Sequence, residues 1–445
     1  MKPTLHIIRA GILGLAVTGQ LAAGAADWAQ FRGPNGSGIA ATDAAPPITW
    51  SAKENLQWRL ALPGPGSSSP IVVGDRVFLT CYTGYGAGPG GGLDQLQRHL
   101  LAVDRRTGKL LWDQAIAATL PEDTYSGYLT EHGYASSTPV SDGERIYVFF
   151  GKSGALAFDW NGRQLWQVNL GQMSSNRRWG SGASPILDQD KLIVNAADES
   201  RSVRALDKLT GKELWKAEAN SLELCFGTPI VAAGPAGRHD LVLAVPGELW
   251  GLNPDTGKLR WFAETGIDGN VSPTVVTADG VIFSTGGFPR MGTVAVRAGG
   301  KGDVSTTNLV WTSQTASYVP SPVVSAGRVF VVSDQGFASC LDARTGESLY
   351  KERLPGASGG GMGGKPFYAS PVLAQDRLYA VSRRNGVFVI GTGAGFKLLA
   401  QNQLAGDNSD FNGTPAIVGR QLFLRSNAAL YCLEAKANGG AGESR

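Results

Sequence analysis

Short apolar runs alternate with polar turns along most of the chain, and one such pattern returns several times. In the copy at residues 102–112, apolar positions lead to Asp104, a Thr107-Gly108 turn follows, and the next run ends at Trp112. An Asp side chain can accept hydrogen bonds from nearby backbone amides, and Gly adopts the positive φ that a tight turn requires. The pattern therefore predicts a β-hairpin that carries a large aromatic ring on its second strand.

A second recurring signal is a small residue followed by Pro at the start of an apolar run. Pro fits the first residue of a strand, where its missing N–H is harmless. From Pro139 onwards these prolines lie 44 to 49 residues apart. Further copies of the hairpin fall between them, at residues 157–166, 205–215, 251–261 and 341–350. The eight pairs are Ser69-Pro70, Thr138-Pro139, Ser184-Pro185, Thr228-Pro229, Ser272-Pro273, Ser321-Pro322, Ser370-Pro371 and Thr414-Pro415.

Each interval holds four short strands, which predicts an all-β fold, an eight-bladed β-propeller of four-stranded antiparallel blades. The eighth unit ends after residues 428–433 and lacks its outermost strand. Residues 55–62 read as an outermost strand without a unit, with Trp58 at the position of Trp112. We expect this N-terminal strand to complete the last blade and close the ring, because closure removes an exposed sheet edge.

The two ends of the chain lie outside the repeats. Residues 1–26 have the basic, apolar, small-residue order of a secretory signal peptide, with retention as an uncleaved anchor as the alternative. No Cys lies near the cleavage point, so we expect no lipid attachment there. Residues 27–54 should form a strap across the first blades, residues 55–435 the propeller, and residues 436–445 a disordered tail. We expect a periplasmic or secreted monomer with no transmembrane segment after cleavage.

Composition narrows the classes of partner. The formal net charge is +3 and no basic cluster is present, so we expect no nucleic-acid partner. No two His have the spacing of zinc ligands, so we expect no zinc site. The chain has 4 cysteines, far apart, which we expect to be buried thiols, although an exported protein could pair some of them. They are Cys81, Cys225, Cys340 and Cys432.

Residues just before each Pro are the candidates for a binding site. The innermost strands of a propeller converge on a central channel, so these residues should line its mouth. They mix aromatic and polar side chains, which suits a small planar ligand or a sugar; filling the channel and capping turns is the structural alternative. The candidates are Glu131, His132, Tyr134, Arg178, Trp179, Asn270, Tyr318, Tyr368, Asp410 and Asn412.

Some of these residues suggest particular chemistry. Adjacent residues on an extended segment point opposite ways, so Glu131 and His132 can act together only if they lie in a loop. Asp410 and Asn412 alternate and would share a face, which suits calcium or, alternatively, the cap of a turn. Arg178 could clamp a carboxylate or remain solvated.

The repeated Ala-x-Asp-x-x-Thr-Gly-x-x-x-Trp pattern, from Trp58 to about Glu434, resembles the pyrroloquinoline quinone (PQQ) repeat. That repeat occurs in quinoprotein alcohol dehydrogenases and in the barrel-assembly lipoprotein. For a dehydrogenase the resemblance implies PQQ beside a vicinal Cys-Cys disulfide, a Trp floor, calcium held by Glu and Asn, and an Asp base. This sequence has no adjacent Cys pair and no Cys-x-x-Cys-His haem motif.

These features favour an exported, non-catalytic propeller that binds a protein or an envelope component. The alternative is an oxidoreductase that uses PQQ and calcium at the channel mouth to oxidise an alcohol or a sugar. A carbohydrate-binding or carbohydrate-cleaving propeller is a third hypothesis, but no carboxylate pair for glycoside cleavage is defined. The sequence assigns no catalytic residue and no metal ligand.

Overall fold

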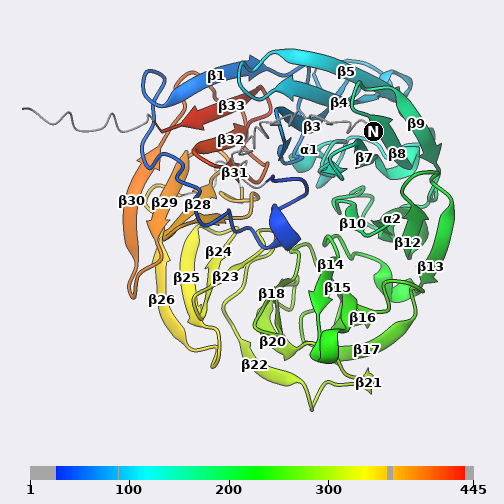
Figure 1. Cartoon of the computed structure of the whole chain (residues 1–445), viewed down its shortest axis with the longest axis vertical. Helices are drawn as coiled ribbons and strands as arrows, with labels where there is room; N and C mark the ends of the chain where they lie inside the picture. Colours follow the sequence, from blue (N-terminus) through cyan, green and yellow to red (C-terminus); the bar gives the residue numbers. More distant parts are fainter. Residues whose placement is uncertain (1–26, 89, 358–363, 436–445) are drawn as a thin grey trace, which may run out of the picture.

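The computed structural model describes residues 27–88, 90–357 and 364–435. They form eight antiparallel sheets arranged as blades around a central channel (Figure 1). The predicted all-β, eight-bladed propeller is confirmed. The predicted signal peptide and C-terminal tail lie outside the described residues.

Within each blade the strands follow the chain from the channel outwards, except that the outermost strand of blade 8 is the first in sequence. The strands of blades 1 to 4 are β2 (Ile71–Val73), β3 (Arg76–Thr83), β4 (Gln97–Asp104), β5 (Leu110–Ala117); β6 (Val140–Ser141), β7 (Arg145–Phe149), β8 (Ala155–Asp159), β9 (Gln164–Val168); β10 (Ile186–Asp188), β11 (Lys191–Ala196), β12 (Ser202–Asp207), β13 (Glu213–Glu218); β14 (Ile230–Ala233), β15 (His239–Val245), β16 (Glu248–Leu252) and β17 (Leu259–Glu264).

The strands of blades 5 to 8 are β18 (Val276–Ala278), β19 (Val281–Gly286), β20 (Gly292–Arg297), β22 (Leu309–Ser313); β23 (Val323–Ser325), β24 (Arg328–Val332), β25 (Phe337–Asp342), β26 (Ser348–Arg353); β27 (Val372–Ala374), β28 (Arg377–Val381), β29 (Val387–Gly391), β30 (Lys397–Asn402); β31 (Ala416–Val418), β32 (Gln421–Arg425), β33 (Ala429–Glu434) and β1 (Leu56–Ala61). The short β21 (Gly302–Asp303) joins the outer edge of blade 4 in parallel with β17. The helical turns are η1 (Pro34–Gly36), η2 (Leu93–Gln95), α1 (Leu129–His132), η3 (Gly151–Ser153), α2 (Ala197–Ser200), η4 (Asn220–Leu222) and η5 (Pro235–Gly237).

The hairpin between the two outer strands has the predicted local chemistry. The carboxylate of Asp104 accepts hydrogen bonds from the backbone N–H of Thr107 at 2.7 Å and from its hydroxyl at 2.6 Å. Gly108 takes φ 71° in the turn. These hydrogen bonds hold the pKa of the Asp104 carboxyl below its usual range. The Asp residues of this repeat are therefore caps of the hairpin.

The Trp that follows most hairpins connects its blade to the next one by a hydrogen bond from its indole, a contact that we call the hairpin lock. The indole N–H of Trp215 donates to the carbonyl of Pro254 in the next hairpin at 2.9 Å. A Cβ on Gly257 would lie 2.4 Å from the Trp215 ring, so only Gly lets the ring rest there. The same hydrogen bond to the next hairpin is made by Trp58, Trp112, Trp166 and Trp311.

The last blade is closed by the N-terminal strand, as predicted. Strand β1 pairs antiparallel with β33, with Trp58 opposite Cys432. The indole of Trp58 then donates to the carbonyl of Arg105 in blade 1. Residues from both ends of the described chain thus share one sheet, and this blade leaves no gap in the ring.

A belt of Ser and Thr hydroxyls joins the blades around the channel. In each blade one hydroxyl accepts the backbone N–H of the belt residue in the preceding blade, at 2.9 to 3.3 Å. Seven members are the Ser or Thr residues that precede Pro in the recurring pairs. Blade 5 differs, because its member is Thr274 and not Ser272. The belt, defined here as these residues, is Ser69, Thr138, Ser184, Thr228, Thr274, Ser321, Ser370 and Thr414.

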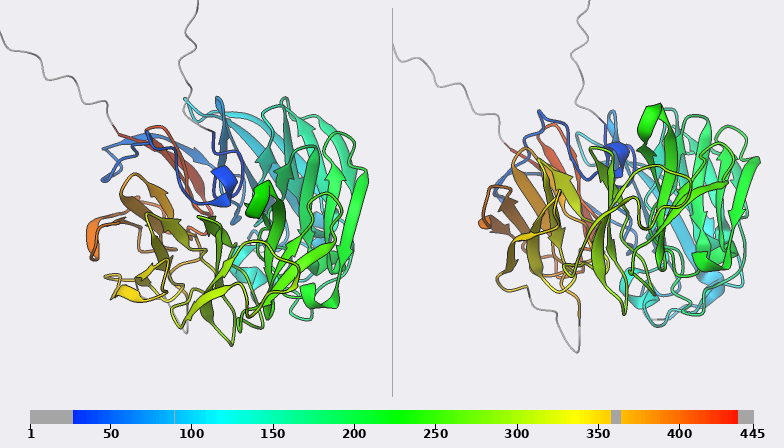
Figure 2. Two further views of the ribbon diagram at one scale, coloured as in Figure 1. Left: turned by 60° about the horizontal axis from the view of Figure 1, so that its bottom comes forward. Right: turned by 90° about the horizontal axis from the view of Figure 1, so that it is seen from below.

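The segment before β1 crosses one face of the ring (Figure 2). Trp28 bridges to Val72 in blade 1, and the strap then reaches Leu373 in blade 7. Arg32 is fully buried, and its guanidinium donates to carbonyls of the strap itself and of Ser321, Pro322 and Pro371. Burial lowers the pKa of Arg32 to about 9. The strap therefore spans the ring. The sequence predicts a strap across the first blades only, and the structure corrects that expectation.

All four cysteines are buried thiols. Within the described ranges we find no helix that is both long and apolar enough to cross a membrane.

Candidate functional site: the propeller channel

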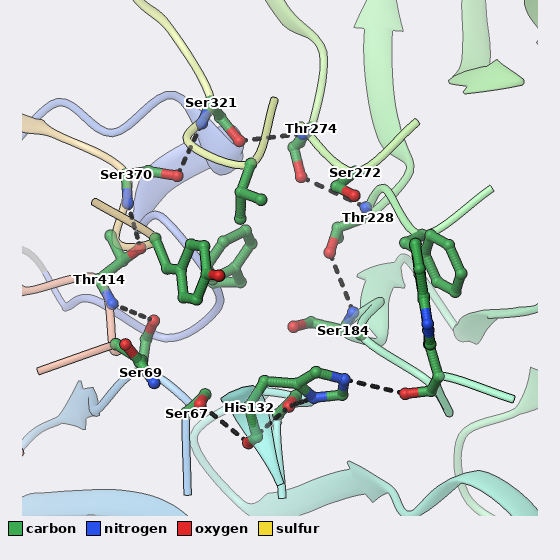
Figure 3. Close-up of a pocket in the computed structure, with 18 of the residues that line it drawn as sticks. Ser67, Ser69, His132, Ser184, Thr228, Ser272, Thr274, Ser321, Ser370 and Thr414 are labelled. Carbon is green, nitrogen blue, oxygen red and sulfur yellow. Dashed lines mark hydrogen bonds between the residues drawn. The ribbon is translucent and has the colours of Figure 1, made fainter. Parts of the chain in front are cut away.

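A cavity of about 150 Å³ lies in the channel, inside the belt (Figure 3). Its lining contains no Asp, Glu, Lys or Arg. All belt residues except Thr138 line it. The belt oxygens accept backbone N–H groups, and no acceptor for the hydroxyl hydrogens occurs among the described residues. The cavity wall can therefore donate hydrogen bonds to a ligand without presenting a charge.

Part of the cavity wall is made of aromatic rings around Tyr128, which precedes α1. The Tyr128 ring centre lies 4.9 Å from that of Trp179 and 5.8 Å from that of Tyr368. Its hydroxyl is buried and has no hydrogen-bond partner in the described structure. Phe31 of the strap also lines the cavity. A ligand in the channel would meet flat aromatic faces as well as the hydroxyl wall.

His132 lines the same cavity, but its hydrogen bonds hold the imidazole in one tautomer. Its Nδ1 lies 2.5 Å from the Ser136 hydroxyl, and its Nε2 lies 2.9 Å from the Trp179 carbonyl, so Nε2 carries the proton and Nδ1 accepts (Figure 3). Burial lowers the pKa of His132 to about 4. A neutral imidazole with both nitrogens engaged is a weak general base.

The charged residues at the mouth are engaged with one another. Arg383 donates to Asp410 at 2.5 Å and to the side-chain oxygen of Asn412 at 3.1 Å, and forms an ion pair with Glu131 at 2.7 Å. Arg384 forms a second ion pair with Asp410 at 2.5 Å. Glu131 and His132 thus face different partners, and the guanidinium of Arg383 lies where Asp410 and Asn412 would have to hold a calcium ion.

Of the ten residues proposed from the sequence, half line the cavity: His132, Trp179, Tyr318, Tyr368 and Asn412. Glu131 and Asp410 lie beside it in the Arg383 network. Asn270 is buried and donates to the Tyr318 hydroxyl at 3.2 Å. Arg178 is exposed, and Tyr134 packs against Tyr82 and lines a different pocket. Their role in ligand binding stays a prediction.

Sequence reasoning missed Tyr128, Phe31 and the central role of Arg383. Tyr128 and Phe31 lie in the long connection after blade 1 and in the strap, which have no repeat positions to align. Arg383 was visible as one of two adjacent cations in a turn. Arg383 and Glu131 are far apart in the sequence, so their contact could not be predicted from it; closure of the ring brings the two side chains together.

PQQ is a flat tricyclic molecule with three carboxylates, so it needs cations and room. No cationic side chain of the described chain lines the cavity. Its volume of about 150 Å³ is close to that of a cavity that holds one benzene ring, which is too small for three fused rings. At the mouth, Glu131 and Asp410 are already paired with Arg383, so neither is free to hold calcium. The residues at the mouth therefore do not fit PQQ with calcium.

Comparison with known proteins gives distant relatives of differing function. The chain is 23% identical over 419 residues to tetrathionate hydrolase from Acidithiobacillus ferrooxidans, covering 85% of this chain and 78% of that one. It is 29% identical to outer membrane protein assembly factor BamB from Kangiella koreensis, covering 42% of this chain and 43% of that one, less than half of its length. A europium-containing methanol dehydrogenase has the same fold, with a TM-score of 0.61, 12% identity and coverage of 92% of this chain and 98% of that one.

The family model described as outer membrane protein assembly factor BamB matches residues 97–352, from β4 to the outermost strand of blade 6. This match covers more than half of the chain, and the propeller has the PQQ-like repeat expected of such proteins. The chain therefore belongs to the family of the outer membrane protein assembly factor BamB.

Proposed function

We propose that this protein is a non-catalytic scaffold of the cell envelope that holds a partner protein on the mouth face of its ring. The mouth face is defined here as the face that carries α1 and the loops before the innermost strands. The main support is the Arg383 network, because it pairs Glu131 and Asp410 with a cation of the protein itself, so neither acid is free to act as a base or to hold a metal. The family description adds the expectation of an outer membrane assembly partner.

The mouth face also carries side chains that suit protein binding. Phe288 is 52% exposed, and its ring centre lies 5.6 Å from that of Tyr318 at the channel mouth. Met173 is 49% exposed in the connection after β9. Arg177 and Arg178 are exposed and form no ion pair with a described residue. Aromatic, Met and Arg side chains are enriched in protein interfaces, so we expect a partner surface with carboxylates around an apolar centre.

Photo-crosslinking in the native envelope tests this docking face. A photoreactive amino acid at position 288 or 178 should crosslink to a component of the outer membrane assembly machinery, identified by mass spectrometry. The same group at Asp75, an exposed turn residue on the strap side, is the matched control. Equal crosslinking from all three positions, or crosslinking only from position 75, would contradict the proposed face.

A PQQ titration tests the absence of the oxidoreductase site independently. We expect neither saturable quenching of Trp fluorescence nor a PQQ-dependent rise in melting temperature, with or without calcium. A calcium effect that does not depend on PQQ has no bearing on this test. Saturable binding of PQQ that requires calcium would overturn the scaffold proposal in favour of an oxidoreductase.

The uncharged cavity supports a second candidate function, the binding of one small aromatic ring with a hydrogen-bond acceptor. Stacking would involve Trp179 and Tyr368, and the belt hydroxyls would donate to the ligand. Phenol and catechol are suitable probes because one ring fills a cavity of this volume. Saturable stabilisation that Trp179→Ala abolishes would support this function, and no binding at millimolar concentration would exclude it for these probes.

A further inference from the structure

A second pocket lies beside the channel where blades 1, 2 and 3 meet. We call it the acidic pocket; its charged residues are Arg98, Glu122, Asp123, Lys152, Asp198 and Glu199. Arg98 lies on β4, Lys152 on η3 and the last two acids on α2, while Glu122 and Asp123 belong to the connection after β5. The pocket therefore draws charged groups from three successive blades into one buried place.

Two of the four acids are paired with the two cations. Arg98 and Glu122 form an ion pair at 2.5 Å, and both side chains are about 5% exposed. Lys152 lies 3.2 Å from Asp123, and these side chains are equally buried. Burial of an ion pair is tolerated when each charge has a partner. These two pairs use all the positive charge of the pocket.

The other two acids, Asp198 and Glu199, have no cationic partner. One oxygen of Asp198 accepts the backbone N–H of Ser175 at 2.9 Å, and one oxygen of Glu199 accepts the Ser181 hydroxyl. The second oxygen of each carboxylate is buried and has no hydrogen-bond partner. Asp198 is 4% exposed and Glu199 is 1% exposed. The hydroxyl of Ser137, which also lines the pocket, is likewise buried and unpartnered.

Two buried carboxylates that are adjacent in sequence, each with one oxygen unpartnered and no cation beside it, are costly unless a positive charge joins them. The pocket formally carries four negative and two positive charges, so one divalent cation would balance it. The free space beside these groups is about 20 Å³, which holds one water-sized or ion-sized particle.

We propose that the acidic pocket binds one calcium ion through the free oxygens of Asp198 and Glu199 and the hydroxyl of Ser137. Calcium prefers oxygen ligands of these types and tolerates irregular geometry. Only two carboxylates take part, since no three acidic, His or Cys side chains converge in the described chain. We therefore expect a weak site, with a Kd on the order of 10⁻⁴ to 10⁻³ M. Calcium here would stabilise the junction between blades 2 and 3.

Calorimetry and terbium luminescence on the intact protein test the site directly. Calcium should bind with a stoichiometry of one and raise the melting temperature in a saturable way, at constant pH and ionic strength. Terbium ions should give luminescence sensitised by Tyr134, which lines the pocket, and calcium should displace them. Magnesium should bind more weakly, because it demands a stricter octahedral geometry.

Glu199→Gln and Asp198→Asn are the matched variants, because each keeps its side chain's shape and removes one charge. Each should lower calcium affinity at least about tenfold, whereas Asp190→Asn, at an exposed acid of the same blade, should leave it unchanged. If the variants do not fold, calorimetry of the unaltered protein still decides the question. No calcium binding at 10 mM, or stabilisation by acid alone, would mean that the pocket holds a proton and would overturn the proposal. None of these outcomes depends on PQQ or on the partner protein.

Discussion

At the scale of single residues, hydrogen-bond capacity decides which candidate side chains are free to act. The repeat spacing correctly brought His132, Trp179 and Asn412 to the channel. It could not show that both nitrogens of His132 are already engaged, or that Asn412 contacts Arg383. Such contacts join residues far apart in sequence, so no local pattern reports them.

The buried imidazole gives a prediction about pH. The unfolded chain binds a proton at His132 near pH 6.5, whereas the folded protein binds it only near pH 4. The contribution of His132 to the free energy of unfolding is therefore complete above pH 6.5 and is lost as the pH falls towards 4, by at most about 3 kcal/mol. Chemical unfolding at a series of pH values should show a shallower decline for His132→Gln than for the parent.

His239→Gln is the control for this measurement, because His239 is exposed and its variant should follow the parent. Carboxylates titrate in the same range, so only the difference between profiles is informative. Parallel profiles for His132→Gln and the parent would show that His132 is not held neutral in the folded protein.

At the scale of elements, the outer hairpin and its Trp are the unit that the sequence describes best. Trp261 departs from this pattern, because its indole donates to Asp240 within its own blade at 2.8 Å. Gly251 leaves the space for that ring, since a Cβ there would lie 2.0 Å from it. The connection between β20 and β22 of blade 5 contains β21, which pairs with β17 of blade 4, in place of the usual hairpin turn that Trp261 would bind. The repeat pattern alone could not show that the Trp261 indole binds within its own blade and not to the next hairpin.

The burial of the indole rings predicts unequal effects of Trp substitutions, although the repeat pattern alone predicts equal ones. Trp215→Ala and Trp261→Ala should each lower the free energy of unfolding by about 3 to 5 kcal/mol, because both rings are buried. Trp112→Ala should cost less, since that ring is partly exposed. Denaturant unfolding measures the difference, with Leu214→Ala, at an exposed position, as the control. A loss for Trp215→Ala no larger than the control's would refute the lock.

At the scale of the whole molecule, the ring is held by devices that cross blade boundaries. Strand β1 completes the last blade, the strap crosses one face of the ring from blade 1 to blade 7, and the belt links every blade to the next. The sequence predicted the closing strand, and it showed the small residues before Pro that supply seven of the belt positions, but not their hydrogen bonds between blades. It did not predict the path of the strap, because that path depends on where blades 6 and 7 lie relative to blade 1.

Blade 5 offers a sharp test of the belt. Thr274→Val removes the oxygen that accepts the Thr228 N–H at 3.3 Å, and should cost about 1 to 3 kcal/mol because a buried amide is left unpaired. Ser272→Ala, at the residue that the sequence pattern favours, should change stability by less than about 0.5 kcal/mol. Thermal unfolding of both variants distinguishes them. The reverse order of the two effects would restore Ser272 to the belt.

The sequence by itself determined the blade, the number of blades, the hairpin caps and the strand that closes the ring. These features depend on residues close together in the chain or on a period repeated along it, so local hydrogen bonding and strand alternation encode them. Only the tertiary structure decided which side chains meet at the mouth, including Tyr128, Arg383 and the acidic pocket. Those groups come from different blades and irregular connections, and their burial, charge pairing and free oxygens exist only after the ring has closed.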